Sequence, residues 1–183
     1  MARIQSIEID QTDGKTKSML QYVNESLGMV PNLMSTLAHS PAALEAYLGF
    51  GKALGGGSLT AKLREQIALT AANVNACEYC ASAHTALGKK LGIDATELQK
   101  NLHASSRDPK VEAALRFAKA VIVRQGWVTD EELKGVREAG YSDGEIIEII
   151  ATTALSIFTN YFNHVAGTEV DFPVVEVGEP ITG

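Results

Sequence analysis

Apolar residues recur along much of this chain at spacings of three and four, which is the period of an α-helix. In residues 13–28 the pattern is carried by Met19, Leu20, Val23 and Leu27. Runs of β-branched residues, which are typical of strands, are few. The pattern therefore predicts an all-α protein.

Capping signals divide this helical sequence into segments. Gly28 ends the first helix, Ser40-Pro41 begins another, and the glycines at 55–57 end it before Thr60 begins the next. Asp108-Pro109 begins a later one. Three further starts have the form of a capping box, with Asp94 and Glu97, Thr129 and Glu132, and Ser142 and Glu145 as the pairs.

These signals predict N-terminal helices within 13–54, a helix pair within 60–92, C-terminal helices within 108–168 and an extended tail at 170–183. We expect them to form a single domain over 1–183, since a chain of 183 residues is long enough for one core of ordinary size. Trp127 follows Gly126 in a predicted loop and is interpreted as a core anchor.

Part of the sequence repeats weakly at an offset of 83 residues. Seven of the 21 positions from 65 to 85 are identical to the residue 83 positions later. The matches indicate either a duplicated helix pair or chance identity between Ala-rich helices. If the pair is duplicated, Cys77 corresponds to Asn160, Cys80 to Asn163 and His84 to Gly167, and the second copy is a scaffold without thiol chemistry.

Composition narrows the class of protein. Hydrophobic residues make up 45% and charged residues 21% of the chain, the profile of a globular protein. The net charge is -6 and no Lys/Arg cluster is interleaved with aromatics, so we expect no nucleic-acid or membrane partner. The N-terminus lacks an apolar leader, and no stretch reaches the roughly 18 apolar residues of a membrane span. We predict a cytoplasmic protein.

The candidate chemistry lies in the pattern E-x11-C-x2-C-x3-H, formed by Glu65, Cys77, Cys80 and His84. The chain has only two cysteines, and they lie three residues apart. In a reducing compartment such a pair is more often catalytic, redox-active or metal-binding than a structural disulfide. The motif therefore predicts a thiol site.

Local structure favours reactivity at this motif. Asn75 with Glu78 resembles a capping box, which places Cys77 in the first turn of a new helix, where unpaired N–H groups favour a thiolate. Residues three and four apart share a helix face, so Cys80 lies beside both Cys77 and His84. The histidine can accept the thiol proton. One thiolate would attack a peroxide, and the other cysteine would convert the sulfenic acid to a disulfide.

Other interpretations of these residues are weaker but specific. A lone cysteine is usually a small core residue. A zinc site could use the same four side chains, but structural zinc usually takes its second ligand pair from a separate knuckle. Tyr79 either packs at a subunit interface or takes part in catalysis. The apolar stripe of Leu33, Met34 and Leu37 is most simply core, and such residues could also form the wall of a substrate pocket.

The segment REQIALTAANVNACEYCASAHTALGKKLG resembles the alkylhydroperoxidase D-like group of the carboxymuconolactone decarboxylase superfamily. VPNLMSTLAHSPAALEAYLGFGKAL before it and IFTNYFNHVAGTEVDFP after it extend the resemblance, to the peroxidase-related members, over nearly the whole chain. The resemblance implies an all-helical bundle and a trimer or hexamer of identical chains. It also implies a hydroperoxide-reducing dithiol that needs no metal or organic cofactor.

By the same resemblance, Cys80 corresponds to the peroxide-attacking thiol, Cys77 to its resolving partner, and Glu65 with His84 to a proton relay. The pattern departs at Tyr79, where well-studied members have a second histidine. A tyrosine hydrogen-bonds but does not shuttle protons near pH 7, so rate and substrate range could differ. Family partners are a peroxiredoxin and a lipoylated acyltransferase. For this chain we predict a peroxide substrate and a dithiol reductant protein.

The leading hypothesis is a thiol-dependent peroxidase in antioxidant defence that cycles between dithiol and disulfide. Two alternatives remain open. One is a cofactor-free enzyme like carboxymuconolactone decarboxylase, which works with acid and base residues and does not need two thiols. The other is a non-enzymatic oligomer whose disulfide state changes a partner surface.

Overall fold

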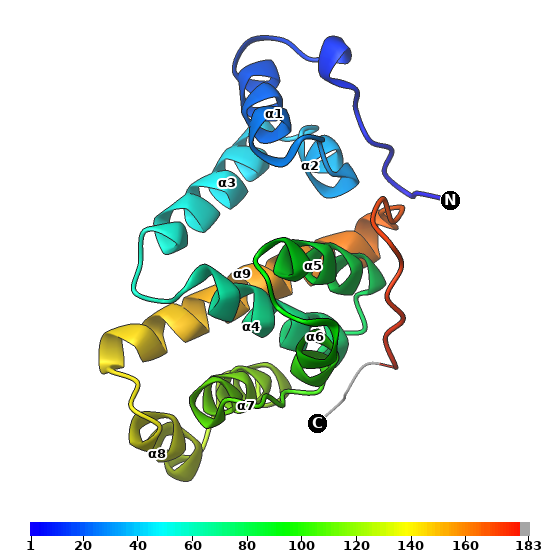
Figure 1. The fold of residues 1–183 in the computed structure, drawn as a ribbon. Coiled ribbons are helices and arrows are strands. Elements are labelled where there is room, and N and C mark those ends of the chain that lie inside the picture. Colours follow the sequence, from blue (N-terminus) through cyan, green and yellow to red (C-terminus); the bar gives the residue numbers. More distant parts are fainter. Residues whose placement is uncertain (180–183) are drawn as a thin grey trace.

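The fold of the chain is described by a computed structural model over residues 1–179, and Figure 1 shows its arrangement. Pro180 and the other residues of 180–183, predicted as part of the extended tail, lie outside this range. Within it there are nine α-helices, one short 3-10 helix and no strand, which confirms the all-α class. The elements are η1 (Ile9–Gln11), α1 (Gly14–Leu27), α2 (Asn32–Leu37), α3 (Pro41–Gly55), α4 (Ala61–Val74), α5 (Glu78–Lys90), α6 (Ala95–Leu102), α7 (Pro109–Val123), α8 (Asp130–Glu138) and α9 (Asp143–Ala166).

The first three helices lie together at one end of the molecule, and α3 leads from them toward the remaining helices (Figure 1). Gly28 ends α1 in the left-handed conformation, and the Ser40 hydroxyl caps α3, as the sequence predicts. The chain start lies beside the end of α9, because the backbone N–H groups of Arg3 and Ile4 both donate to the carbonyl of Ala166.

Helix α4 lies at the centre of the packing and is buried on nearly all sides. It contacts α5, α6, α7 and α9. Leu69 joins the apolar cluster under α1–α3 and α5, whereas Leu63 and Ile67 join the cluster formed with α7, α8 and α9. Because α4 belongs to both clusters, it fixes the position of α5 relative to α9, and these two helices carry the thiol site.

The turn from α4 to α5 differs from the predicted capping box. Asn75 is the C-terminal cap of α4, and Ala76 has a left-handed backbone with φ 54°. Cys77 N–H donates to the carbonyl of Ala72 at 2.7 Å, which completes a Schellman-type ending. Cys77 itself is the N-cap of α5. The Asn75–Glu78 prediction is therefore wrong by two positions, because the Asn75 amide contacts α9 instead.

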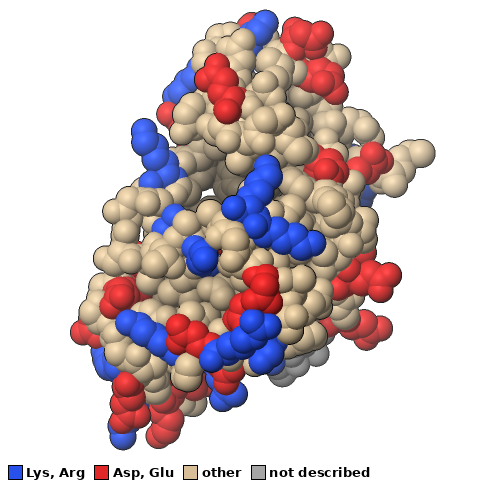
Figure 2. Space-filling model, viewed as in Figure 1, with Lys and Arg blue, Asp and Glu red and all other residues tan. Residues whose placement is uncertain are grey.

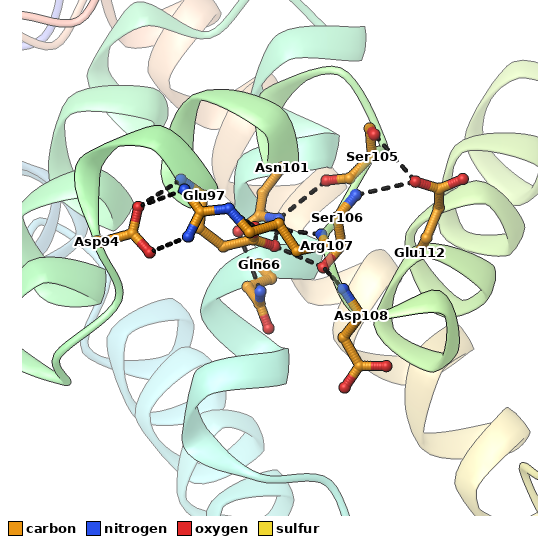
Figure 3. A network of polar contacts seen from close by, with 9 residues as sticks. All are labelled: Gln66, Asp94, Glu97, Asn101, Ser105, Ser106, Arg107, Asp108 and Glu112. Carbon is orange, nitrogen blue, oxygen red and sulfur yellow. Dashed lines mark hydrogen bonds and ion pairs between the residues drawn. The ribbon is translucent and has the colours of Figure 1, made fainter.

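Of the three later predicted capping boxes, two are complete and one has only the hydrogen bond to the N-cap side chain. Thr129 with Glu132 and Ser142 with Glu145 form both reciprocal bonds. Asp94 accepts the N–H of Glu97, but the Glu97 carboxylate turns away into the polar network of Figure 3. There it accepts hydrogen bonds from the side chains of Asn101 and Ser106 and from the N–H of Arg107, and it holds α6 against the loop before α7.

The 83-residue offset does not mark a repeated helix pair. In the first copy α4 ends at Val74 and α5 begins at Glu78, whereas α9 continues unbroken from Asp143 to Ala166 across the corresponding positions. The matched segments are instead helices that pack against one another, since α9 contacts both α4 and α5.

The segment after α9 is extended to residue 179, as predicted for that part of the tail, and it returns along the molecule (Figure 1). Val170, Phe172 and Val175 pack against the cluster that contains both cysteines. The N–H of Val175 donates to the Ser82 hydroxyl at 2.9 Å, and the Asp171 carboxylate accepts the N–H of Asn32 at 2.7 Å. The tail thus connects α5 with α2.

The prediction that Trp127 is a core anchor is wrong, because its side chain is 86% exposed.

Charged side chains of both signs gather over the lower part of the face in Figure 2, where Figure 1 places α6, α7 and α8. Ion pairs at the ends of α7, α8 and α9 include Arg124 with Glu132 and Arg137 with Asp143. Among the helices of residues 1–179, none combines the length and apolar character needed to cross a bilayer.

Candidate active site

The two cysteines lie at the start of α5 as buried free thiols. Cys77 is 1% exposed and Cys80 is 2% exposed. The Cys77 sulfur takes the place of a capping oxygen, because it accepts the N–H of Cys80 at 3.3 Å. The C-x2-C spacing therefore places one sulfur at the helix N-terminus and the other in the first turn.

Two asparagines of α9 approach these sulfurs from the opposite side. Asn163 Nδ2 lies 3.2 Å from Cys80 Sγ and 4.0 Å from Cys77 Sγ. Asn160 lies one turn earlier on α9 and also interacts with Cys80. Its amide is oriented by Asn75, whose Nδ2 donates to Asn160 Oδ1 at 2.8 Å. The sulfur pair is thus held between the start of α5 and the C-terminal part of α9.

His84 and Glu65 form the pair that the motif predicts. His84 Nδ1 lies 2.7 Å from Glu65 Oε2, and both side chains are partly buried. Glu65 belongs to α4, which is packed against α5, so the carboxylate faces the helix that carries His84. When Nδ1–H donates to Glu65, the lone pair of Nε2 is free to accept a proton.

A cavity of about 70 Å³ reaches one sulfur of the pair. Cys80 and His84 line it, whereas Cys77 does not. Its walls are mostly apolar and aromatic and are formed by Leu27, Met29, Pro31, Leu33, Met34, Tyr47, Tyr79, Ala83, Leu87 and Phe172, with Lys90 and Thr159 also lining it. The prediction that Leu33 and Met34 belong both to the core and to a pocket wall is confirmed.

Tyr79 lines this cavity and lies inside the protomer. Its side chain is buried, its hydroxyl accepts the N–H of Leu33 at 3.1 Å, and its ring meets Phe172 edge-on at 5.9 Å. The subunit-interface interpretation of Tyr79 is therefore wrong. Burial and the nearby Asp171 carboxylate raise the pKa of the phenol, against the effect of the Leu33 N–H, so Tyr79 stays protonated near neutral pH.

The two thiols differ in acidity. The hydrogen bond that Cys77 makes to Cys80, together with burial, raises the pKa of Cys77. Burial alone would also raise the pKa of Cys80, but hydrogen bonds from Cys77 and Asn163, the charge of His84 and the nearby Asn160 amide lower it below its ordinary value. Cys80 is thus the thiolate of the pair, and Cys77 is the thiol that donates to it.

Electrostatic coupling extends from Cys80 to the histidine. Burial alone would lower the pKa of His84, but the charge and hydrogen bond of Glu65 and the charge of Cys80 raise it above its ordinary value. Burial, with the charges of Cys80 and Glu65, raises the pKa of Tyr47, which also lines the cavity. The site therefore contains a thiolate beside an imidazole that can hold a proton.

All five predicted side chains, Glu65, Cys77, Tyr79, Cys80 and His84, meet at this site. Sequence reasoning did not assign a role to Tyr47 or Phe172. It also interpreted Asn160 and Asn163 as part of a scaffold, although both interact with Cys80. No local sequence signal indicated their proximity to the cysteines, because it depends on the packing of α9 against α4 and α5.

The zinc alternative needs Glu65, Cys77, Cys80 and His84 to converge on one ion. Over the described residues, no group of three or more His, Cys, Asp and Glu side chains is arranged to hold a metal ion. Instead, His84 Nδ1 faces Glu65, and the sulfurs face each other and α9. The arrangement is that of a proton-coupled thiol pair.

Comparisons with known proteins show which sequences and folds this chain is similar to. The sequence model of the carboxymuconolactone decarboxylase family matches residues 41–122, which include the whole motif. A comparison with curated protein sequences finds no match.

Solved structures of similar fold extend the likeness over the chain. The alkylhydroperoxidase AhpD core of a peroxidase-related protein from Ralstonia eutropha JMP134 is 26% identical with a TM-score of 0.85, covering 93% of this chain and 92% of that one. A peroxidase-related protein from Silicibacter sp. TM1040 is 23% identical with a TM-score of 0.79, covering 91% and 92%. The debrominase Bmp8 is 20% identical with a TM-score of 0.80, covering 92% of each chain.

Proposed function

We propose that this chain, which matches the carboxymuconolactone decarboxylase family over residues 41–122 and is similar to an alkylhydroperoxidase AhpD core over nearly its whole length, is a thiol-dependent peroxidase. The observation that carries the proposal is the asymmetry of the cysteine pair. Cys80 lines the cavity and has the lowered pKa, whereas Cys77 lies behind it, outside the cavity, with a raised pKa. This asymmetry is consistent with Cys80 as the nucleophile and Cys77 as its resolving partner.

In the first step, the Cys80 thiolate attacks the terminal oxygen of a hydroperoxide. An S–O bond forms, the O–O bond breaks, and the departing alkoxide takes a proton from His84 to leave as an alcohol. Cys80 is then a sulfenic acid. Glu65 orients His84 and stabilises the imidazolium before that proton is transferred.

In the second step, the Cys77 sulfur attacks the Cys80 sulfur. An S–S bond forms, the S–O bond breaks, and the hydroxyl leaves as water with the proton of the Cys77 thiol. The sum is oxidation of two thiols to a disulfide and reduction of the hydroperoxide to alcohol and water. An external dithiol then restores the pair by thiol–disulfide exchange.

The walls of the cavity favour an organic hydroperoxide. Apolar and aromatic side chains surround the approach to Cys80, and no carboxylate lines the cavity within the described residues. A small apolar substituent could replace water there at a gain in free energy. Hydrogen peroxide would react at the same sulfur but would gain nothing from these walls.

The decisive experiment is single-turnover oxidation of the fully reduced protein by hydrogen peroxide and by cumene hydroperoxide. Free thiols and intact mass are followed as a function of pH. We expect rapid loss of two thiols per chain, a mass decrease of two hydrogens and an apparent pKa below about 7.5. Slow oxidation with an unperturbed thiol pKa of about 8.5 would contradict the proposal.

A second candidate reaction uses the same pair. Bmp8 is a debrominase, and a cysteine-to-alanine variant of it has been solved with 2,3,4-tribromopyrrole. In this chain, the aromatic cavity beside Cys80 could hold a brominated ring. The thiolate would take the bromine, the ring carbon would take a proton, and Cys77 would then displace bromide to form the disulfide. Bromide release from a brominated pyrrole, with two thiols lost per bromide, would support this reaction.

The two alternatives predicted by the sequence give different outcomes. A lactone decarboxylase would keep its activity when both Cys77 and Cys80 are changed to serine, because acid–base chemistry does not need the sulfurs. A redox sensor would be oxidised once per pair and would not turn over with any dithiol reductant supplied. Turnover that disappears in the double serine variant would exclude both.

A further inference from the structure

We propose that the side-chain amides of Asn163 and Asn160 on α9 form a donor site for the Cys80 thiolate and thereby favour the reduced cysteine pair over its disulfide. The inference rests on the proposed dithiol–disulfide cycle. It adds a role for α9, which lies outside the cysteine motif and provides no other ligand to the sulfurs within the described residues.

One amide contacts the Cys80 sulfur, and a second lies one turn away on the same helix. Asn163 and Asn160 are only 4% and 1% exposed, so water does not compete freely for their N–H groups. Asn163 Nδ2 lies 3.2 Å from Cys80 Sγ. Asn75 donates to the oxygen of the Asn160 amide and so leaves the Asn160 nitrogen for the sulfur.

Both amides have an atom that the rest of the described structure does not satisfy. Asn160 Nδ2 and Asn163 Oδ1 are buried, and neither has a hydrogen-bond partner among the described residues. Yet Asn160 interacts closely enough to contribute to the lowered pKa of Cys80. A buried, unpaired N–H donor is destabilising, and an acceptor such as the Cys80 thiolate would offset that cost for Asn160 Nδ2. Asn163 Nδ2 already contacts the sulfur, and Asn163 Oδ1, itself an acceptor, gains nothing from it.

The reduced and oxidised cysteine pairs differ in how well their sulfurs accept hydrogen bonds from these amides. A thiolate is an anion and accepts charge-assisted hydrogen bonds, which are stronger than neutral ones. A disulfide sulfur has no net charge and is a poor acceptor. The amides therefore stabilise the reduced pair more than the oxidised pair, which makes the disulfide easier for an external dithiol to reduce.

Other groups that act on Cys80 have a different pH dependence. His84 and Tyr47 line the same cavity, and Cys77 and Glu65 lie behind them. The contribution of His84 disappears as the imidazolium loses its proton. The amides do not titrate, so their contribution remains constant with pH. This difference allows the two effects to be separated.

The test compares the wild-type protein with Asn163→Leu, Asn160→Leu and the control Thr153→Val. Thr153 is buried on the same helix and donates to the carbonyl of Ile149, away from the sulfurs. The pKa of the reactive thiol is measured from alkylation rates against pH, and the disulfide potential is measured in glutathione buffers. Neither measurement involves a peroxide.

We expect each leucine variant to raise the thiol pKa by about one unit, which is a tenfold loss of thiolate at a fixed pH below the pKa. The disulfide potential should fall by up to about 30 mV, the value of a tenfold change for two electrons. Thr153→Val should leave both quantities unchanged, and the shift in the leucine variants should persist when His84 is replaced by glutamine.

A folded leucine variant with the wild-type pKa and potential would overturn the inference. If Asn163→Leu does not fold, Asn163→Ser, which keeps a small polar group, is measured instead with the same criterion. The result is separable from the peroxidase proposal. A shifted pKa in a protein that does not react with peroxides would support the amide site alone, and normal turnover with unshifted values would refute only the amide site.

Discussion

Two polar clusters of this molecule, one partly exposed and one buried, differ in how completely their atoms are paired. In the network of Figure 3, Glu97 accepts from Asn101, Ser106 and Arg107, and Glu112 accepts from the hydroxyl of Ser105. None of its nine residues has a buried side-chain polar atom without a partner. At the sulfur pair, by contrast, both Asn160 and Asn163 have such an atom.

The pKa directions show the same difference. In the network, hydrogen bonds to Ser106 and Asn101 and the charge of Arg107 outweigh burial and lower the pKa of Glu97, so its carboxylate stays charged in one arrangement. At the thiol site the pKa of Cys80 is lowered while those of Cys77 and His84 are raised. The fully paired cluster holds its carboxylates in one charged arrangement, whereas the incompletely paired one contains groups with pKa values shifted in opposite directions, as the proposed thiol chemistry requires.

The sharpest test of this contrast is removal of the reactive sulfur. We expect Cys80→Ser to lower peroxide turnover by a factor on the order of 10³ or more, because the remaining thiol, Cys77, lies outside the cavity and has a raised pKa. Cys77→Ser should react once and then accumulate sulfinic acid, detectable by mass, because no thiol resolves the sulfenic acid. Full turnover in either variant would contradict the mechanism.

Removal of a network carboxylate should affect the fold and not the chemistry. Glu97→Ala should lower the free energy of unfolding by about 2–3 kcal/mol, because Ser106 and Asn101 lose a buried acceptor. The alkylation rate of Cys80 in the folded variant should be unchanged. Urea denaturation at pH 7 measures the first quantity, and a loss of thiol reactivity in the folded protein would mean that the two clusters are coupled.

The same carboxylate predicts a pH dependence of stability. Its pKa is lower in the folded state than in the unfolded chain, where it is about 4.3, so its stabilisation is present above that value. It is lost as the pH falls through the folded-state pKa. Urea denaturation between pH 7 and pH 3 should therefore show a smaller loss of stability on acidification in Glu97→Gln than in the wild type.

The histidine–carboxylate pair predicts a smaller effect on rate. Glu65→Gln should reduce peroxide turnover by about 10- to 100-fold, because His84 loses its orienting carboxylate. The pKa of His84 is raised mainly by Glu65 against the effect of burial, so the imidazolium should lose its proton at a lower pH in the variant. The alkaline limb of kcat/KM against pH should move to lower pH, and an unchanged limb would exclude His84 as the proton donor.

Tyr79 should have the smallest effect. Tyr79→Phe removes the acceptor of the Leu33 N–H and should lower the free energy of unfolding by about 1 kcal/mol. We expect less than about a threefold change in peroxide turnover, because the phenol is held protonated and the ring contact with Phe172 is retained. A loss of tenfold or more in stopped-flow oxidation would give Tyr79 a catalytic role.

Sequence patterns correctly predicted those features of this protein that depend on residues within about one helical turn of each other. The capping boxes at Thr129 and Ser142 formed as predicted, because both partners lie three residues apart. Cys77, Cys80 and His84 share one side of the site because their spacing is helical. Even the contact between Glu65 and His84 followed from two helices joined by a short turn.

The tertiary structure alone decided which distant groups surround the sulfurs. Asn163 is 83 residues from Cys80 and reaches it because α9 and α4 bury their apolar faces together, a free energy that no local pattern measures. The same packing turned Asn75 toward Asn160 and left Trp127 in solvent. The sequence by itself determined an all-helical protein with a thiol pair, and the packing of its helices determined the surroundings that set the acidity of each thiol.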